Sequence, residues 1–221
     1  MRKLIFLCFL FSFGFRFFTL AQSYEIVLPP HLKVIFDEKE KGLDGSPWLT
    51  ETWSPGIITL TSGKIIDGLK YRYNVYRNRL YFQYENSEYV VGSPDSVKQI
   101  IMDGKKFVYD SSDPKDKDKK RFLEVLVDGK ATLYINYYPF MIPSNYNIAL
   151  GSGSKNETVS TKESYLLKVG SNLVVVDKKG KIIPLTLVDK KKEITDFMKK
   201  EKISAKKRFD LEKVIRYYNS L

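Results

Sequence analysis

The chain has 221 residues, a formal net charge of +11, one cysteine and one histidine. With one residue of each type, a single chain can form neither an intrachain disulfide nor a zinc site that uses two histidines. A domain of about 200 residues buries about 70% of its extended-chain surface, so a hydrophobic core can hold it without disulfides.

The first 21 residues have the organisation of a secretory signal peptide. Two basic residues precede an apolar run that extends to Phe15, and Thr19 and Ala21 are small residues suitably placed for a cut before Gln22. A transmembrane anchor is the weaker alternative, because Arg16 interrupts the run well short of the roughly 20 residues that cross a bilayer. We therefore expect an exported protein that is periplasmic, outer-membrane-associated or secreted.

Cleavage would remove Cys8 and three basic residues. Of the rest, residues 22–177 hold 20 basic and 20 acidic residues, whereas residues 178–221 hold 14 and 6. We therefore expect a β-rich body over residues 22–188 and a basic helical pair over residues 189–221, packed on the same domain.

The body, from Ile57 to about Leu187, consists of short β-branched and aromatic runs separated by turn residues, which is typical of antiparallel sheet. The clearest hairpin is Tyr71–Tyr84. With a two-residue turn at Arg77–Asn78, its apolar residues share one face, and polar residues and tyrosines share the other. Thr61–Lys64 lacks the glycine spacing of a phosphate loop, so it predicts a strand–turn–strand rather than a nucleotide site.

The next segments alternate between loops and hairpins. Residues 110–120 read as a connector of alternating charge, although their aspartates could in principle bind Ca²⁺: Asp110, Asp113, Asp116 and Asp118. Four neighbouring lysines disfavour that site. Asp128-Gly129 predicts a tight turn between two strands that are apolar on both faces and hence central in the sheet.

A long polar loop is expected from Pro139 to Ser164. After it, residues 165–169 and 173–176 predict a third hairpin, and residues 182–187 predict an edge strand, because Pro184 cannot donate a ladder hydrogen bond.

The C-terminal segment has helical periodicity. Asp189 is expected to cap a first helix over Lys190–Lys202. Two narrow apolar stripes should pack against the sheet, with the lysines outward: Ile194, Phe197 and Met198, then Leu211, Val214, Ile215, Tyr218 and Leu221. The predicted fold class is α+β, with a mainly antiparallel body (a sandwich or a partly open barrel) closed by two C-terminal helices.

Three features together resemble a group of small exported proteins from Bacteroidetes. These are the Ala21-Gln22 junction, the Tyr-Arg-Tyr-Asn-Val-Tyr segment at residues 71–76, and a lysine-rich final helix ending Tyr217-Tyr-Asn-Ser-Leu221. The resemblance implies a Gram-negative envelope location. It assigns no activity and no functional residue.

Catalytic patterns are weak. His31, which a serine triad would require, follows two prolines and is expected to be solvated or capping. Ser152 and Lys155 lie in a glycine–serine loop, and Ser204, spaced for a dyad with Lys207, fits better as a helix cap. Carboxylate pairs for glycoside hydrolysis cannot be assigned from spacing.

Two surfaces are candidates for binding. Tyrosines expected to be exposed could form a platform for sugar rings, although tyrosine also suits half-buried strands: Tyr76, Tyr81, Tyr137 and Tyr138. Basic residues of the helical end could contact anionic lipid or lipopolysaccharide, or simply be solvated: Lys199, Lys200, Lys202, Lys206, Lys207 and Arg208. Asn156 and Ser96 lie in short sequences that match glycosylation motifs.

The leading hypothesis is a non-enzymatic exported binding or interaction module without a cofactor. Its partner would be an envelope protein, a polysaccharide or an anionic membrane surface, and export disfavours nucleic acid. The alternatives are an envelope-polymer hydrolase with carboxylates not identifiable from sequence, and surface docking through the basic helices.

Overall fold

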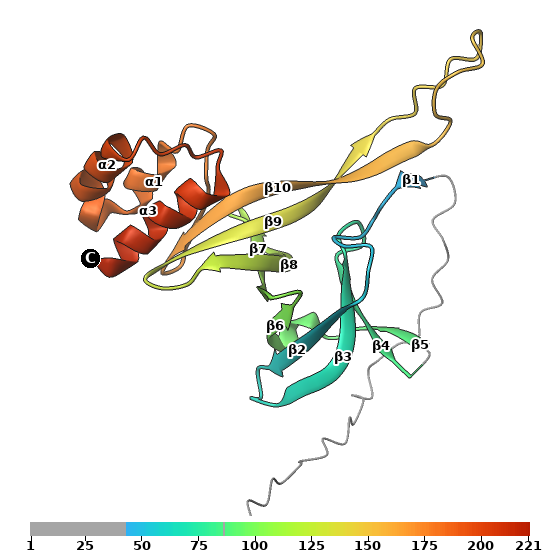
Figure 1. Ribbon diagram of the computed structural model, residues 1–221, viewed down its shortest axis with the longest axis horizontal. Helices are drawn as coiled ribbons and strands as arrows, with labels where there is room; N and C mark the ends of the chain where they lie inside the picture. The colour runs from blue at the N-terminus through green and yellow to red at the C-terminus, as the bar shows by residue number, and fades with distance from the viewer. Residues whose placement is uncertain (1–42, 86) are drawn as a thin grey trace, which may run out of the picture.

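The computed structural model describes residues 43–85 and 87–221 (Figure 1). The predicted signal peptide and His31 lie outside these residues. The strands of the described part form one open sheet in the order β1-β10-β9-β8-β7-β6-β2-β3-β4-β5. β11 pairs with residues 166–169 of β10, whereas β1 pairs with residues 157–159. Ten strands of the sheet follow the antiparallel pattern, and β1 pairs with β10 in parallel. The α+β class with mainly antiparallel strands is thus confirmed.

The strands are β1 (Leu43–Gly45), β2 (Ser54–Leu60), β3 (Ile65–Asn74), β4 (Arg79–Tyr84), β5 (Ser87–Val90), β6 (Val97–Met102), β7 (Lys105–Asp113), β8 (Asp116–Val127), β9 (Ala131–Ile142), β10 (Glu157–Val169) and β11 (Asn172–Val175). The helices are η1 (Pro94–Ser96), α1 (Ile182–Thr186), η2 (Val188–Lys190), α2 (Lys191–Lys200) and α3 (Arg208–Ser220).

The β3–β4 hairpin has the predicted faces in a different register. Tyr71 pairs with Phe82 and Tyr73 with Leu80, so the turn has four residues rather than two. The displacement is two residues along the partner strand, and an even shift leaves every side chain on its original face. The longer turn is fixed by Asn78, which has a φ of 53° and accepts a hydrogen bond from the Tyr73 hydroxyl at 2.8 Å.

Residues 110–120 form a hairpin, not the expected connector. β7 continues to Asp113 and β8 begins at Asp116. Ser111 and Ser112 are buried and donate from their hydroxyls to backbone carbonyls of the same hairpin. This strand pair was not predicted, because residues 110–120 are polar on both faces and show no apolar alternation.

The β8–β9 hairpin at Asp128-Gly129 is confirmed, and both strands are interior in the sheet. Alternate residues of these strands enter two different apolar clusters. Phe122 and Leu133 belong to the main core, whereas Leu123 and Tyr134 pack with Leu166 on the opposite face. The predicted coverage of both faces is therefore present.

The expected edge strand over residues 182–187 is wrong, because this segment forms the short helix α1. Pro184 lies in its first turn, where a backbone N–H has no helical partner and proline is tolerated. The Asp177 carboxylate accepts the Ile182 amide at 2.8 Å. Ile183 and Leu187, one turn apart, are fully buried.

The two predicted C-terminal helices are present as α2 and α3, and α3 packs on β8 and β9. Ile194 of α2 and four stripe residues of α3 are buried: Leu211, Val214, Ile215 and Tyr218. Two details differ from expectation. Leu221 is 41% exposed. Asp189 is not the cap of α2, since Lys190 occupies that position and Asp189 accepts a hydrogen bond from the Tyr218 hydroxyl at 3.0 Å.

Candidate functional site

The four tyrosines predicted to form a platform do not share an exposed face. Tyr81 and Tyr137 are buried, whereas Tyr76 is 39% exposed and Tyr138 is partly exposed. Tyr81 was expected on the polar face of its hairpin, but Trp48, from the segment before β2, packs edge-on against its ring at 5.1 Å. This covering residue is distant in sequence, so strand alternation could not reveal it.

Tyr137 belongs to a buried polar cluster that fastens α3 to the sheet. Its hydroxyl donates to Glu124 Oε2 at 2.7 Å, and the other oxygen of Glu124 is 2.9 Å from the Arg208 guanidinium. Glu124 is 1% exposed. Burial and the adjacent carboxylate raise the pKa of the Tyr137 hydroxyl, so it remains a donor. Arg208 also pairs with Glu212 at 2.8 Å.

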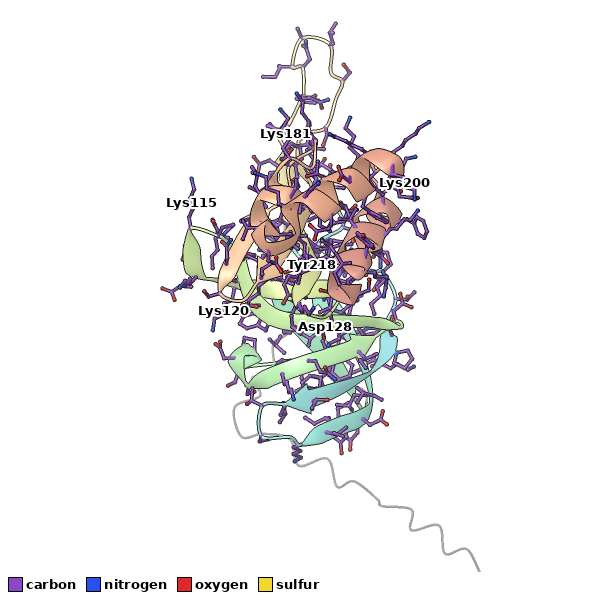
Figure 2. The ribbon with its side chains drawn as sticks, turned by 90° about the vertical axis from the view of Figure 1, so that its left-hand side faces the viewer. Lys115, Lys120, Asp128, Lys181, Lys200 and Tyr218 are labelled. Atoms are coloured by element: carbon purple, nitrogen blue, oxygen red, sulfur yellow. The ribbon has the colours of Figure 1, made fainter. Side chains whose placement is uncertain are left out.

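Arg208 is therefore paired with two carboxylates, although its side chain is 46% exposed, and this pairing distinguishes it from the neighbouring lysines. The other predicted contact residues are exposed near the end of α2 and in the segment before α3: Lys199, Lys200, Lys202, Lys206 and Lys207. Figure 2 shows Lys200 at this helical end of the molecule.

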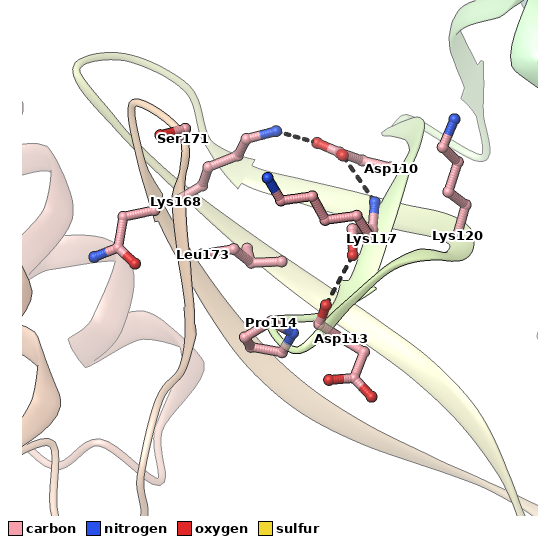
Figure 3. A pocket seen from close by; sticks show the side chains of 10 residues that line it. Asp110, Asp113, Pro114, Lys117, Lys120, Lys168, Ser171 and Leu173 are labelled. Atoms are coloured by element: carbon pink, nitrogen blue, oxygen red, sulfur yellow. Dashed lines mark hydrogen bonds and ion pairs between the residues drawn. The ribbon is translucent and has the colours of Figure 1, made fainter.

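A groove of about 370 Å³ lies between the β7–β8 turn and the β10–β11 hairpin. Lys168 reaches across it to pair with Asp110 (Figure 3). The backbone amide of Lys115 and the nearby Lys119 lower the pKa of the Asp113 carboxyl, which is the opposite of the change that a general acid requires.

Three of the four candidate calcium ligands are thus already engaged: Asp110 with Lys168 of β10, Asp113 with the Lys115 amide and Lys119, and Asp116 with the Asp118 amide. Within residues 43–85 and 87–221, no three His, Cys, Asp or Glu residues are grouped so that they could hold a metal ion.

The remaining candidates make local contacts. The Lys155 ammonium lies 4.8 Å from the Tyr146 ring centroid, and Ser204 precedes α3, whose cap is Lys207 rather than the expected serine. The Asn156 side chain donates to Asp44 at 3.0 Å, and the Ser96 hydroxyl donates to the Ser93 carbonyl at 2.6 Å.

The feature that the sequence reading missed is the arm, defined here as residues 138–162. It comprises the outer halves of β9 and β10 and the connecting loop, and it projects far beyond the rest of the sheet (Figure 1). Twelve of the 26 residues of the expected loop are paired strand, at 139–142 and 157–164, and residues 143–156 connect the two strands.

Apolar side chains follow the arm to its end. Tyr138, Phe140 and Ile142 alternate along β9 and therefore share one face, with Phe140 40% and Ile142 46% exposed. At the tip, defined as residues 147–152, Ile148 is 88% and Leu150 75% exposed. Ile148 is the most exposed large hydrophobic side chain in the described part of the chain.

The tip is held in an ordered loop. Asn147 and Ser152 form a β-bridge in which the Asn147 amide donates to the Ser152 carbonyl at 2.8 Å. The Asn147 side chain accepts the Leu150 amide at 3.1 Å. Behind the tip, Asp44 of β1 accepts hydrogen bonds from Ser154 and Asn156, and these bonds lower the pKa of its carboxyl. The exposed aliphatic side chains are therefore presented by a built structure.

The sequence carried a signal for this arm. Lys155 is the only charged residue from Tyr138 to Asn156, and apolar residues alternate at 138, 140 and 142. The glycines and serines around Gly151 led instead to a polar loop as the interpretation.

Among the described residues, no helix combines the length and the apolar character needed to cross a membrane. Comparison with protein-family models, curated proteins and solved structures gives no match to this chain.

Proposed function

We propose that this protein is an exported binding or interaction module, and that the arm is the element that contacts its target. The observation that carries this proposal is the presentation of Ile148 and Leu150, 88% and 75% exposed, at the end of a hydrogen-bonded projection. Contiguous exposed apolar surface on a soluble protein marks an interaction site more often than a chance arrangement.

The energetics favour the same interpretation. Burying an exposed aliphatic side chain contributes about 1.5–3 kcal/mol, and the fold obtains only a small part of this free energy from Ile148 and Leu150. Phe140 and Ile142 are further exposed apolar side chains nearer the body, separated from the tip by Ser144 and Asn145. A target that covers the tip would gain this free energy.

The basic helical end is a second candidate contact surface. Its five lysines are exposed, and cations near an anionic surface contribute about 1 kcal/mol each. They lie at the opposite end of the long axis from the tip (Figure 1). One flat surface can therefore meet the tip or the helical end, and variants can separate the two.

Thiol accessibility tests the proposal without knowledge of the target. In a Cys8→Ser background the chain has no other cysteine, so Ile148→Cys supplies a single thiol at the tip. We expect this thiol to react with a water-soluble maleimide more slowly in envelope fractions than in the purified protein.

Lys115→Cys is the matched control, because it lies at the exposed turn of the β7–β8 hairpin (Figure 2). Its labelling rate should be the same in both preparations. Equal rates for Ile148→Cys in both preparations would show that nothing covers the tip and would refute the proposal.

A further inference from the structure

We infer that the target of the arm is the surface of a phospholipid bilayer that contains anionic lipid, into which the tip inserts Ile148 and Leu150. This inference rests on the proposed function and names the partner class. It follows from the shape of the arm, the chemistry of the tip and the residues immediately behind it.

The shape favours a fluid target. The tip is the turn of a two-stranded projection, so few side chains can reach a target at once (Figure 1). A stable protein–protein interface buries about 800 Å² on each partner and requires a complementary surface. A bilayer accommodates a narrow apolar projection without such a surface.

The chemistry of the tip permits entry into the bilayer. Residues 147–152 are Asn-Ile-Ala-Leu-Gly-Ser and carry no charge. The amides of Asn147, Leu150 and Ser152 donate to acceptors within the same loop. Moving a backbone group out of water costs less free energy when the group is already hydrogen-bonded. Unpaired backbone groups are the main obstacle to irregular structure in lipid.

The residues behind the tip match the chemistry of a membrane interface. The Lys155 ammonium lies over the Tyr146 ring, and further back the Lys162 ammonium is 3.1 Å from the Phe140 ring centroid. Tyrosines and lysines are typical of the headgroup region, where the amphipathic tyrosine ring lies between the acyl chains and water and the lysine ammonium reaches the lipid phosphate. Ser144 and Asn145 precede the tip and Ser154 follows it, and these polar residues would limit insertion to a shallow depth.

Flotation with vesicles of phosphatidylcholine and phosphatidylglycerol tests the inference on the protein expressed from its full sequence. We expect the wild type to float with the vesicles. The double variant Ile148→Ser/Leu150→Ser should bind on the order of a hundredfold more weakly, because each lost aliphatic contact weakens binding by about tenfold.

The matched control is Leu185→Ser/Val188→Ser, which removes two exposed aliphatic side chains from the helical end, 55% and 72% exposed. Its binding should equal that of the wild type. A variant that combines Lys199→Gln, Lys200→Gln, Lys202→Gln, Lys206→Gln and Lys207→Gln should also retain binding, because these lysines belong to α2 and the segment before α3, at the opposite end of the molecule from the tip (Figure 1).

Two results would overturn the inference. Loss of binding in the five-lysine variant, with the tip variant unchanged, would assign the membrane contact to the basic helices. Failure of the wild type to float, while the Ile148→Cys thiol is protected in envelopes, would show that the arm binds another target, so that the proposed function stands and the lipid target fails.

Discussion

Tyr71 and Tyr73 are neighbours on one face of β3 and differ in what their hydroxyl groups contact. Both are fully buried. The Tyr73 hydroxyl donates to Asn78 Oδ1 at 2.8 Å, whereas the Tyr71 hydroxyl has no hydrogen-bond partner among the described residues. A buried polar group without a partner loses its bonds to water and gains nothing in return.

Removing each hydroxyl should therefore have opposite effects. We expect Tyr71→Phe to leave the free energy of unfolding unchanged or to raise it by about 1 kcal/mol, and Tyr73→Phe to lower it by about 1 kcal/mol. Urea denaturation of both variants measures the difference. Equal destabilisation by the two substitutions would contradict the assigned contacts.

Buried tyrosines also predict a loss of stability at high pH. Burial raises the pKa of Tyr73 and of Tyr134 to about 12, above the value of about 10 for an exposed tyrosine. Their contribution is complete below the unfolded pKa and is lost as the pH rises through the folded pKa, because the unfolded chain ionises first. The raised pKa of each tyrosine should lower the free energy of unfolding by about 1 kcal/mol as the pH rises from about 10 to 11.

Denaturation midpoints over this pH range test the expectation. Tyr134→Phe should reduce the slope of the free energy of unfolding against pH. A slope that is identical in this variant and the wild type would contradict the proposed role of Tyr134.

At the level of elements, the attachment of α3 depends on Asn219. Its side chain accepts the Ala131 amide at 2.8 Å and donates to the Ala131 carbonyl at 2.9 Å. It thereby joins the end of the last helix to the start of β9, and Gly129 lies so close that a side chain there would collide with Asn219.

Asn219→Ala should leave both polar groups of the fully buried Ala131 unpaired and lower the free energy of unfolding by about 1–3 kcal/mol. Ser220→Ala, at the next position but exposed, should change it by less than about 0.5 kcal/mol. Hydrogen exchange at the Ala131 amide provides a local measurement. Unaltered exchange in Asn219→Ala would show that the helix is held by other contacts.

Elements were predictable from sequence where one face is apolar. The β3–β4 face survived an error of two residues in register, because the alternation fixes the face but not the turn length. The strand predicted around Pro184 is wrong, because proline is tolerated both in an edge strand and in the first turn of a helix. Alternation also failed at residues 110–120, where both faces of the hairpin are polar.

Candidate site residues were less predictable, because their surroundings come from distant parts of the chain. In the sequence, Arg208 is one of several neighbouring basic residues, but the Glu124 carboxylate with which it pairs lies on β8. The strand alternation predicts that Tyr81 is exposed, but Trp48 packs against its ring. Pairings of this kind depend on tertiary packing and leave no spacing signal.

At the scale of the whole molecule, β9 and β10 have different surroundings at their two ends. At one end, α3 packs on β8 and β9 and α1 contacts β11, and the other end of β9 and β10 forms the arm (Figure 1). Asn219 fixes the helical end to β9, which extends into the arm, and the Glu124–Arg208 pair fixes it to the neighbouring strand β8. The helices thus anchor the base of a projection whose tip remains free for a target.

An environment-sensitive fluorophore at the tip measures the central claim most directly. We attach it to Ile148→Cys in the Cys8→Ser protein and add phosphatidylcholine–phosphatidylglycerol vesicles. The account predicts a blue-shifted and brighter emission, as the probe leaves water, and no change for the same probe at Lys115→Cys. An unchanged emission at position 148, with the protein bound to the vesicles, would contradict insertion of the tip.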